Sequence, residues 1–368
     1  MTFEDIEASL PKCDVWQYLS NNKKPVVMYG MGNGADKIIA ELDKINVCIS
    51  DFFASDGFVR GQLFHGKKML SFSDIKEKYN DFIILVSFGS EREDVIKLIS
   101  DLDAEYELYL PDVPVAGENI FNFEFYIKNR ESIKIAFELL ADDLSKEIFG
   151  DIILYKLTGK IDRLLTNAHN DDNLYKLYDT KKWRLCVDAG AYRGDSAEIF
   201  NKNAPDLERI IAIEPDKKNF KKLLENTNVL KASVEGYNVC AWKEKGSVAF
   251  DLGGNRNSSV SGIGHVPSIG DTKEVIAKSD TIDNILNGRR CDFIKFDVEG
   301  SESAALDGSV NTLKNSSPDM LVSIYHRSED IFSLVVKTNE LLKDHKLYIR
   351  RKRCLPAWEI SLLAVKHK

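Results

Sequence analysis

The chain has 368 residues, of which 43% are hydrophobic and 29% charged, so it is long enough for about two folded globular domains. Its formal net charge of −8 argues against a nucleic-acid surface, and we interpret the basic run at 350–353 as a solvated strand end. Since no apolar run is long enough to span a membrane and the N-terminus is acidic, unlike a signal peptide, we expect a cytoplasmic protein.

The first part of the chain alternates apolar strands with helical segments, which predicts a small α/β domain over residues 1–117. After its first strand, Gly30, Gly32 and Ala35 fit the G-x-G-x-x-A pattern of dinucleotide-binding turns, and Asp51 follows the next strand. A lone match of this kind is weak. Three interpretations stay open: a structural domain without ligand, a nucleotide or nucleotide-sugar site, and a dinucleotide site. Strands are expected at 25–29, 47–49, 82–87 and 106–110.

The remainder divides into a helical linker at 118–182 and a second α/β domain at 183–368. Apolar residues recur at intervals of three or four in the linker, and we expect its helices to cover one edge of the second sheet. The last two predicted strands have no helix between them, which predicts an antiparallel pair at the sheet edge. Strands are expected at 185–189, 209–214, 236–241, 247–252, 292–297, 319–325, 346–351 and 359–366.

The most informative motif is the turn that follows the strand at 185–189. Gly190 and Gly194 stand in this turn, a helix begins after it, and the next strand ends in Glu214. Glycines let backbone N–H groups approach a ligand, and an acid at a strand tip accepts hydrogen bonds from both ribose hydroxyls. The motif therefore predicts a nucleoside site.

The neighbours of this turn indicate which nucleoside it binds. The turn lacks the glycine spacing of a diphosphate cradle, and Asp188 beside it would repel a diphosphate. A carboxylate there suits a ligand that carries ammonium and sulfonium groups, as S-adenosylmethionine does. The alternative is an ordinary helix start, in which Asp195 and Ser196 only cap the first amides of the helix.

Asp297, Glu299 and His326 are the candidates for the catalytic base, because they follow strands at the ends where open α/β sheets bind ligands. Glu299 could instead be an acid favoured by a helix N-terminus, and His326 a hydrogen-bonded structural histidine. Asp297 is the strongest candidate, because Gly300 lets the chain turn sharply there. The acids could also hold a divalent cation, but we predict no metal, because no histidine or third acid stands at ligand spacing beside Asp297 and Glu299. The polar, glycine-rich segment 252–259 is expected to form a mobile loop over the acceptor or else a solvated hairpin.

From Asp151 to Val365 the chain resembles the FkbM family of S-adenosylmethionine-dependent methyltransferases. The resemblance rests on the turn at 188–196, on the run 292–302 and on the run 323–330, in that order. With the N-terminal part, which is similar to small Rossmann-like domains fused to sugar-modifying enzymes, it implies an α/β protein of two Rossmann-like domains. The C-terminal domain is expected to be a seven-stranded methyltransferase sheet with a reversed edge strand.

The resemblance also implies an activity and a set of site residues. It implies O-methylation of a sugar or glycan hydroxyl, in polysaccharide or glycolipid biosynthesis, with S-adenosylmethionine as cofactor. Arg351 stands where the family frequently has histidine, so acceptor specificity does not carry over. The resulting cofactor-binding set is Asp188, Gly190, Ala191, Tyr192, Gly194, Asp195, Ser196, Glu214, Pro215 and Ala241, and the catalytic set is Asp297, His326 and Glu299.

The expected partner is a sugar, nucleotide-sugar or glycan acceptor, with neither a nucleic acid nor a membrane span, and a homo-oligomer stays open. Two other functions compete. The chain could be a non-catalytic nucleotide-sugar-binding or scaffold protein that uses a methyltransferase fold, or a nicotinamide-dependent oxidoreductase that uses the N-terminal turn. The presence of Asp188, Glu214 and Asp297 together favours the methyltransferase.

Overall fold

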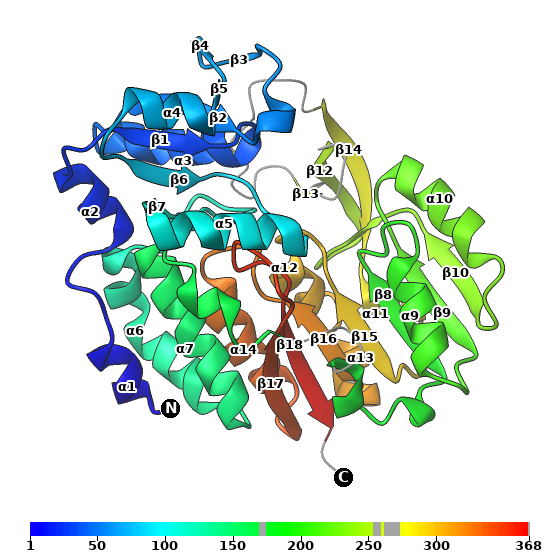
Figure 1. Cartoon of the computed structure of the whole chain (residues 1–368). Coiled ribbons are helices and arrows are strands. Elements are labelled where there is room, and N and C mark those ends of the chain that lie inside the picture. Colours follow the sequence, from blue (N-terminus) through cyan, green and yellow to red (C-terminus); the bar gives the residue numbers. More distant parts are fainter. Residues whose placement is uncertain (169–173, 253–258, 261–272, 367–368) are drawn as a thin grey trace.

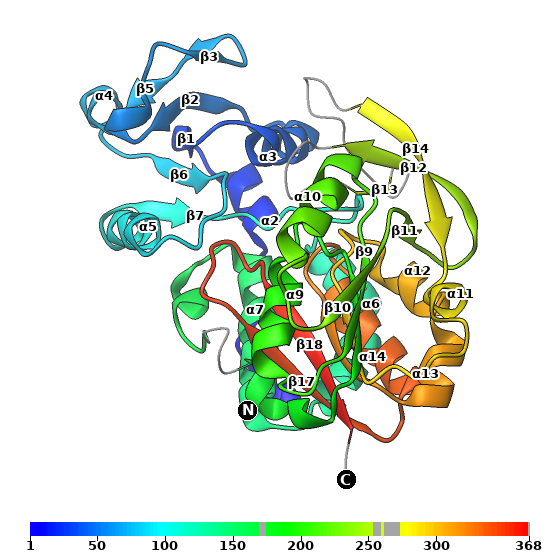
Figure 2. The same cartoon turned by 90° about the vertical axis from the view of Figure 1, so that its right-hand side faces the viewer.

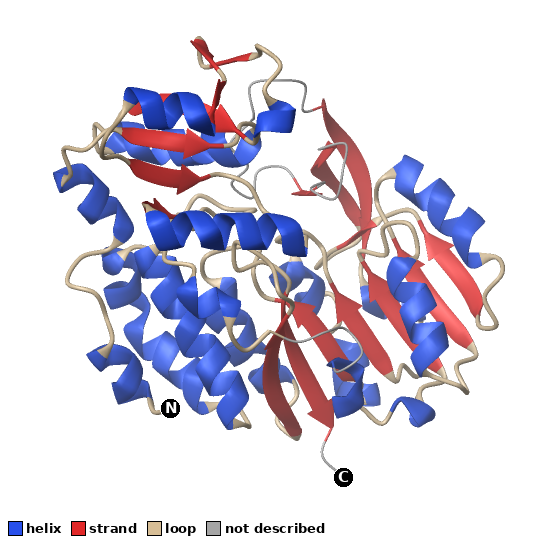
Figure 3. Cartoon of the chain, in the orientation of Figure 1, coloured by secondary structure: helices blue, strands red, loops and turns tan. Residues whose placement is uncertain are grey.

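The computed structural model of the chain describes residues 1–168, 174–252, 259–260 and 273–366. Its strands form a five-stranded sheet, a seven-stranded sheet, a four-stranded sheet and a two-stranded sheet, with helices packed around the two largest (Figure 3). The predicted α/β class is confirmed.

The N-terminal part of the chain forms the five-stranded sheet and its helices. In chain order its elements are α1 (Phe3–Ala8), α2 (Val15–Asn21), β1 (Val26–Tyr29), α3 (Asn33–Lys44), β2 (Ile49–Ala54), η1 (Asp56–Phe58), β3 (Leu63–Phe64), β4 (Lys67–Lys68), β5 (Leu70–Ser71), α4 (Phe72–Lys78), β6 (Ile83–Val86), α5 (Glu93–Glu105) and β7 (Glu107–Tyr109). The sheet is parallel, in the order β5-β2-β1-β6-β7. Strands β1 and β6 are buried along their whole length, as expected where helices cover both faces of a parallel sheet. The short strands β3, β4 and β5 were not predicted.

The helical linker and the C-terminal part supply the remaining elements. Those before the second sheet are α6 (Phe123–Glu138), α7 (Asp143–Thr158), η2 (Asp162–Leu165), η3 (Tyr175–Leu177) and η4 (Thr180–Lys182). The strands of the seven-stranded sheet are β8 (Leu185–Ala189), β9 (Arg209–Ile213), β10 (Ser233–Tyr237), β15 (Phe293–Phe296), β16 (Asp319–Ser323), β17 (His345–Arg351) and β18 (Ile360–Lys366). The helices between them are α9 (Asp195–Asn203), α10 (Lys217–Thr227), α11 (Ile282–Leu286), α12 (Glu302–Asp307), α13 (Val310–Ser316) and α14 (Asp330–Leu341).

The seven-stranded sheet has the order β10-β9-β8-β15-β16-β18-β17. Strand β18 runs antiparallel to both of its neighbours, whereas the edge strand β17 points the same way as β16. The reversed strand therefore lies one position inside the edge instead of at the edge. The reason is that α14 carries the chain across to a parallel strand and leaves a gap, which β18 then fills as the second arm of a hairpin.

A separate four-stranded sheet has the order β11-β14-β12-β13. Its strands are β11 (Cys240–Ala241), β12 (Gly246–Leu252), β13 (Ser259–Val260) and β14 (Lys273–Asp280). The predicted strand at 236–241 is thus divided between two sheets, and β14 was missed because its apolar residues do not alternate with polar ones. Among its described side chains, Ile276 is 75% exposed. The loop expected at 252–259 lies largely outside the described residues.

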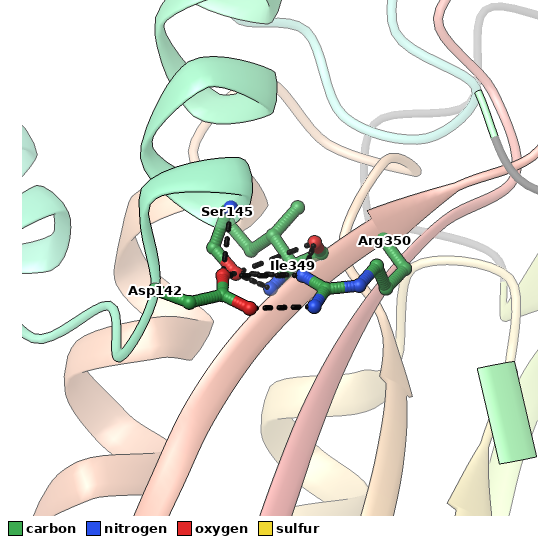
Figure 4. Close-up of polar contacts among 4 residues, drawn as sticks. All are labelled: Asp142, Ser145, Ile349 and Arg350. Carbon is green, nitrogen blue, oxygen red and sulfur yellow. Dashed lines mark hydrogen bonds and ion pairs between the residues drawn. The ribbon is translucent and has the colours of Figure 1, made fainter. Parts of the chain in front are cut away.

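The linker helices pack against the C-terminal part, α6 against α14 and α7 against the edge strand β17. Figure 4 shows the polar contacts that join α7 to this strand. The Arg350 guanidinium donates to Asp142 Oδ2 at 2.6 Å and to Ser145 Oγ at 2.9 Å, and Ser145 Oγ also accepts from the Ile349 amide at 2.9 Å. These contacts join the N-terminal turn of α7 to the edge strand and fix the helix there.

The first half of the basic run at 350–353 is buried, contrary to the prediction of a solvated strand end, whereas Arg353 is exposed. Arg350 and Arg351 are only 7% and 2% exposed. Arg351 donates to the backbone carbonyl groups of Leu164 and Thr166, so it holds the segment after α7. Long cationic side chains are buried in this way only where their donors are satisfied.

One continuous apolar cluster joins the N-terminal sheet, the linker helices and the seven-stranded sheet, with Ile84, Ile133, Ile153 and Ile294 among its fully buried members. The domain limits at 117 and 182 accordingly stay a prediction. Figure 1 and Figure 2 show the N-terminal sheet at the end of the seven-stranded sheet opposite the C-terminus, which is the end where the parallel strands terminate. Within the described ranges, no helix is long and apolar enough to cross a membrane.

Candidate functional site

A cavity of about 740 Å³ lies where the carboxyl ends of the parallel strands of the two largest sheets meet. The loops after β8, β9, β15 and β16 line it from one side, and the loops after β1 and β6 line it from the other. This is the position at which open α/β sheets bind ligands. The two sheets therefore enclose one site between them.

The glycine turn after β8 forms part of the cavity wall. Gly190 and Gly194 have φ values of +86° and +98°, which residues with a side chain rarely adopt. A Cβ atom on Gly190 would lie 1.8 Å from the backbone oxygen of Asp297, and one on Gly194 would lie 2.6 Å from the Thr227 methyl group. Gly190 is thus needed for the close approach of the β8 and β15 loops, which brings Asp297 beside the turn.

Most of the predicted cofactor residues lie together at this cavity. Asp188 and Gly194 are not among the described residues that line it. The lining includes Gly190, Ala191, Tyr192, Asp195, Ser196, Glu214, Pro215 and Ala241. Binding of a cofactor by this set stays a prediction.

Glu214 follows β9 at the cavity and is held by the backbone of the glycine turn. Its Oε2 accepts from the Tyr192 amide at 2.9 Å, and its Oε1 accepts from the Asp216 amide at 2.8 Å. Burial raises the pKa of Glu214 to about 7, although the two amide hydrogen bonds act to lower it. The carboxylate is thereby fixed in place and titrates in the neutral range.

Asp188 is completely buried next to Lys295. Its Oδ1 lies 3.7 Å from Lys295 Nζ, and neither carboxylate oxygen has a hydrogen-bond partner within the described part of the chain. Burial raises the pKa of Asp188 to about 6. Asp188 therefore lies behind the cavity wall as an incompletely compensated acid.

Asp297 faces the cavity, with 31% of its side chain exposed, and pairs with Lys295 Nζ at 3.1 Å. Burial acts to raise the pKa of Asp297, but the charges of Lys295 and His326 outweigh it and lower the pKa to about 2. Asp297 is therefore ionised throughout the neutral range. Glu299 also lines the cavity and has 23% of its side chain exposed.

His326 lies behind these acids and is completely buried. Its Nδ1 is 3.0 Å from Glu302 Oε1, and its Nε2 is 3.4 Å from Glu299 Oε2 and 3.8 Å from Asp297 Oδ1. Burial acts to lower the pKa of His326, but Glu302 and Glu299 outweigh it and raise the pKa to about 10. In the protein without a bound cation, this histidine keeps its proton at neutral pH and is a poor base.

The structure brings the three predicted catalytic residues together, but it overturns the ground for predicting no metal. Both a histidine and a third acid, Glu302, stand beside Asp297. The sequence analysis missed Lys295 and Glu302. Since Lys295 and Asp297 are two residues apart at the end of one strand, the period of two could have indicated that they share a face. No local signal pointed to Glu302.

The sequence analysis did not predict the residues that line the opposite side of the cavity. Asn33 and Lys37 of α3 line it, together with Trp358 and Glu359 of the β17–β18 loop. Lys37 Nζ donates to the carbonyl groups of Pro114 and Val115 at 2.7 and 2.8 Å, and burial lowers the pKa of Lys37 to about 8.

Asp51, the acid expected to bind the ribose, does not support the dinucleotide interpretation of the N-terminal turn. Asp51 lies inside β2 instead of at its tip, and its carboxylate accepts hydrogen bonds from Lys78 at 2.7 Å and from Tyr79. An acid occupied in this way is not placed to bind a ribose at the carboxyl end of the sheet.

Comparison with known proteins identifies the family. Residues 188–351 match the family model described as the methyltransferase FkbM domain. We call this matched part of the chain the FkbM domain. The domain spans the glycine turn, Glu214 and the whole cluster of acids around His326. No curated protein sequence matches the chain.

Solved structures resemble the chain to different degrees. Methyltransferase FkbM from Methylobacillus flagellatus KT has a TM-score of 0.67 and 17% identity, covering 98% of this chain and 96% of that one. An rRNA methylase from Streptococcus thermophilus has a TM-score of 0.34 and 11% identity over 54% of this chain and 93% of its own. Fibrillarin from Aeropyrum pernix, crystallised with natively bound S-adenosyl-L-methionine, has a TM-score of 0.32 and 14% identity over 51% and 68%. The first of these likenesses includes the N-terminal sheet as well as the FkbM domain.

Proposed function

We propose that the protein is an S-adenosylmethionine-dependent O-methyltransferase that acts on a hydroxyl group of a sugar, nucleotide sugar or glycan in polysaccharide or glycolipid biosynthesis. One observation carries this proposal: a single cavity holds the glycine turn with Glu214 on one wall and the ionised Asp297 on another. The glycine turn and Glu214 suit a nucleoside, and Asp297 suits an acceptor hydroxyl that must lose a proton.

The residues fit this cofactor. Gly190 lets the turn lie close against the loop after β15. The buried oxygens of Asp188, which have no hydrogen-bond partner in the described part of the chain, leave local negative charge behind the turn. S-adenosylmethionine would supply a methyl group on a sulfonium, which is positively charged. Glu214 would accept the ribose hydroxyls, and Asp297 would hold and orient the acceptor hydroxyl through its proton. Because methyl transfer is an in-line displacement, alignment of the acceptor oxygen is the main task of the protein.

The part of the cavity wall that contains Trp358, which we call the acceptor wall, favours a sugar as the acceptor. Trp358 packs directly on Gly89, since a Cβ atom there would lie 2.3 Å from the indole ring, and it lines the cavity beside Glu359 and Glu91. An indole offers a flat apolar face for a sugar ring, and neighbouring carboxylates accept hydrogen bonds from hydroxyl groups. The loop after β6 of the N-terminal sheet completes this wall, so the N-terminal sheet would help to enclose the acceptor.

Cofactor binding is expected to depend on pH through Glu214. Its pKa of about 7 means that the carboxylate is protonated as the pH falls through 7, and the protonated acid has less capacity to accept ribose hydrogen bonds. From pH 8 to pH 6 the ionised fraction falls about tenfold, so the affinity for S-adenosylmethionine should fall about tenfold. Isothermal titration calorimetry of the full chain at both pH values measures this change.

Glu214→Gln should weaken binding at pH 8 by roughly 1 to 3 kcal/mol and remove the pH dependence. Glu225→Gln, an exposed acid on α10, is the matched control and should behave like the wild type. Equal affinities in the wild type and Glu214→Gln would place the ribose elsewhere. Absence of binding in the wild type would favour the non-catalytic scaffold.

Trp358→Ala is expected to raise the KM for the acceptor by about tenfold or more while leaving S-adenosylmethionine affinity unchanged, because the ring lies on the acceptor wall. A panel of nucleotide sugars and glycans with methyl-labelled cofactor identifies an acceptor, and steady-state kinetics then measure KM. Trp358→Phe retains a flat ring and should recover most of the loss. An unchanged KM in Trp358→Ala would remove this residue from the acceptor site.

A further inference from the structure

Three residues of the cluster around His326 keep buried polar atoms for which the described residues provide no hydrogen-bond partner. These atoms are Oδ1 of Asp297, Oε2 of Glu302 and both ring nitrogens of His326. His326 and Glu302 are 0% and 1% exposed. Unsatisfied buried groups are uncommon in folded proteins, and a water molecule or an ion usually accounts for them.

The ion pairs within the cluster do not account for these atoms. The ring nitrogens of His326 lie 3.0 to 3.8 Å from carboxylate oxygens, but neither makes a hydrogen bond of acceptable geometry. Three carboxylates, those of Asp297, Glu299 and Glu302, surround this one imidazole. Lys295 is shared between Asp297 and Asp188. The four atoms therefore have no hydrogen bonds within the described part of the chain, and such atoms are costly to bury.

We propose that Asp297, Glu302 and His326 bind a divalent cation. One ligand atom from each residue lies within 4.8 Å of the others, close to the separation of about 4.4 Å that two opposite bonds of about 2.2 Å to one ion span. The other oxygens of the two acids are already held, Asp297 Oδ2 by Lys295 at 3.1 Å and Glu302 Oε1 by the Val298 amide at 2.8 Å. Such outer contacts orient ligating carboxylates and leave their second oxygens for the metal.

The ligand set indicates which cations fit. An imidazole nitrogen with two carboxylate oxygens suits Mn²⁺, Fe²⁺ or Zn²⁺, whereas Mg²⁺ prefers oxygen ligands alone. Asp297 and Glu299 line the cavity, so an ion can enter from there and its open positions face the acceptor. If the proposed function holds, the cation would increase the acidity of the acceptor hydroxyl, whose proton would leave to solvent. Its oxygen would then form the new bond to the methyl carbon as the bond from that carbon to sulfur breaks and S-adenosylhomocysteine leaves with the electron pair.

The test is Mn²⁺ binding to the full-length protein after treatment with a chelator. Loss of the electron paramagnetic resonance signal of free Mn²⁺ measures binding, and pulsed spectra of bound Mn²⁺ show whether a ¹⁴N nucleus of an imidazole is coupled to it. We expect saturable binding of about one ion per chain with ¹⁴N coupling. No binding at millimolar Mn²⁺, or bound Mn²⁺ without nitrogen coupling, would overturn the proposal, and both results come from the wild type alone.

Variants locate the ion. His326→Gln and Glu302→Gln should each weaken Mn²⁺ binding by at least about tenfold, and His326→Gln should abolish the ¹⁴N coupling. Circular dichroism checks that each variant is folded. Glu214→Gln is the matched control, because it should weaken S-adenosylmethionine binding and leave Mn²⁺ affinity unchanged. Retained ¹⁴N coupling in folded His326→Gln would assign the ion to another site, and Mn²⁺ binding without S-adenosylmethionine binding would refute the proposed function but not the metal site.

Discussion

Asp297→Asn is expected to lower kcat by about a hundredfold or more while changing the affinity for S-adenosylmethionine by less than about threefold. The substitution keeps the size of the side chain but removes the charge that faces the cavity beside Lys295, and with it the group that holds the proton of the acceptor hydroxyl. Single-turnover transfer of a labelled methyl group measures the chemical step, and calorimetry measures cofactor binding.

The matched control for this variant is Asp307→Asn. Asp307 is a half-exposed acid of the same domain that pairs with Lys337 at 2.7 Å, away from the cavity. Its replacement should leave both constants within about twofold of the wild type. Wild-type turnover in Asp297→Asn would exclude Asp297 from the reaction.

Gly190→Ala is expected to destabilise the protein by about 3 kcal/mol or more and to abolish cofactor binding. The added methyl group would lie 1.8 Å from the backbone oxygen of Asp297, so the β8 and β15 loops would have to move apart. This movement would disrupt the cofactor turn and the cluster of acids together. Urea unfolding measures the loss of stability.

A second glycine distinguishes the effect of the steric clash from the effect of the positive φ value. Gly288 has a φ of +79°, close to that of Gly190, but a Cβ atom there would meet no atom within 4 Å among the described residues. Gly288→Ala should therefore lower the free energy of unfolding by only about 1 kcal/mol, because alanine is strained in the left-handed conformation. It should leave cofactor binding intact. Equal effects of the two substitutions would mean that the close approach to Asp297 does not matter.

The pairing of two sheets around one cavity gives the N-terminal part a place in the proposed reaction. Lys37 and Asn33 reach the cavity from α3, the helix that follows β1, opposite the glycine turn. An enclosed site strengthens electrostatic interactions because it excludes water. The variants of Trp358 test this acceptor wall from the side of the β17–β18 loop.

The sequence by itself determined the features that depend on local patterns. The apolar runs that contain Val187 and Ile211 predicted buried parallel strands, since a strand covered on both faces must be apolar along its length. The glycine turn and Glu214 followed from the ends of these two strands, because neighbouring parallel strands bring their carboxyl ends to one edge. Asp297 and His326 were predicted to be neighbours for the same reason.

Only the tertiary structure decided which distant residues complete the site. Glu302 carries no periodic signal, and its burial beside His326 depends on how the loops after β15 and β16 pack together. Lys37 and Trp358 belong to segments more than three hundred residues apart in the sequence, and they share a cavity only because the two sheets meet there. Periodicity reports which face of a single element is buried, whereas contacts between elements depend on chain crossings and loop packing, which leave no local pattern.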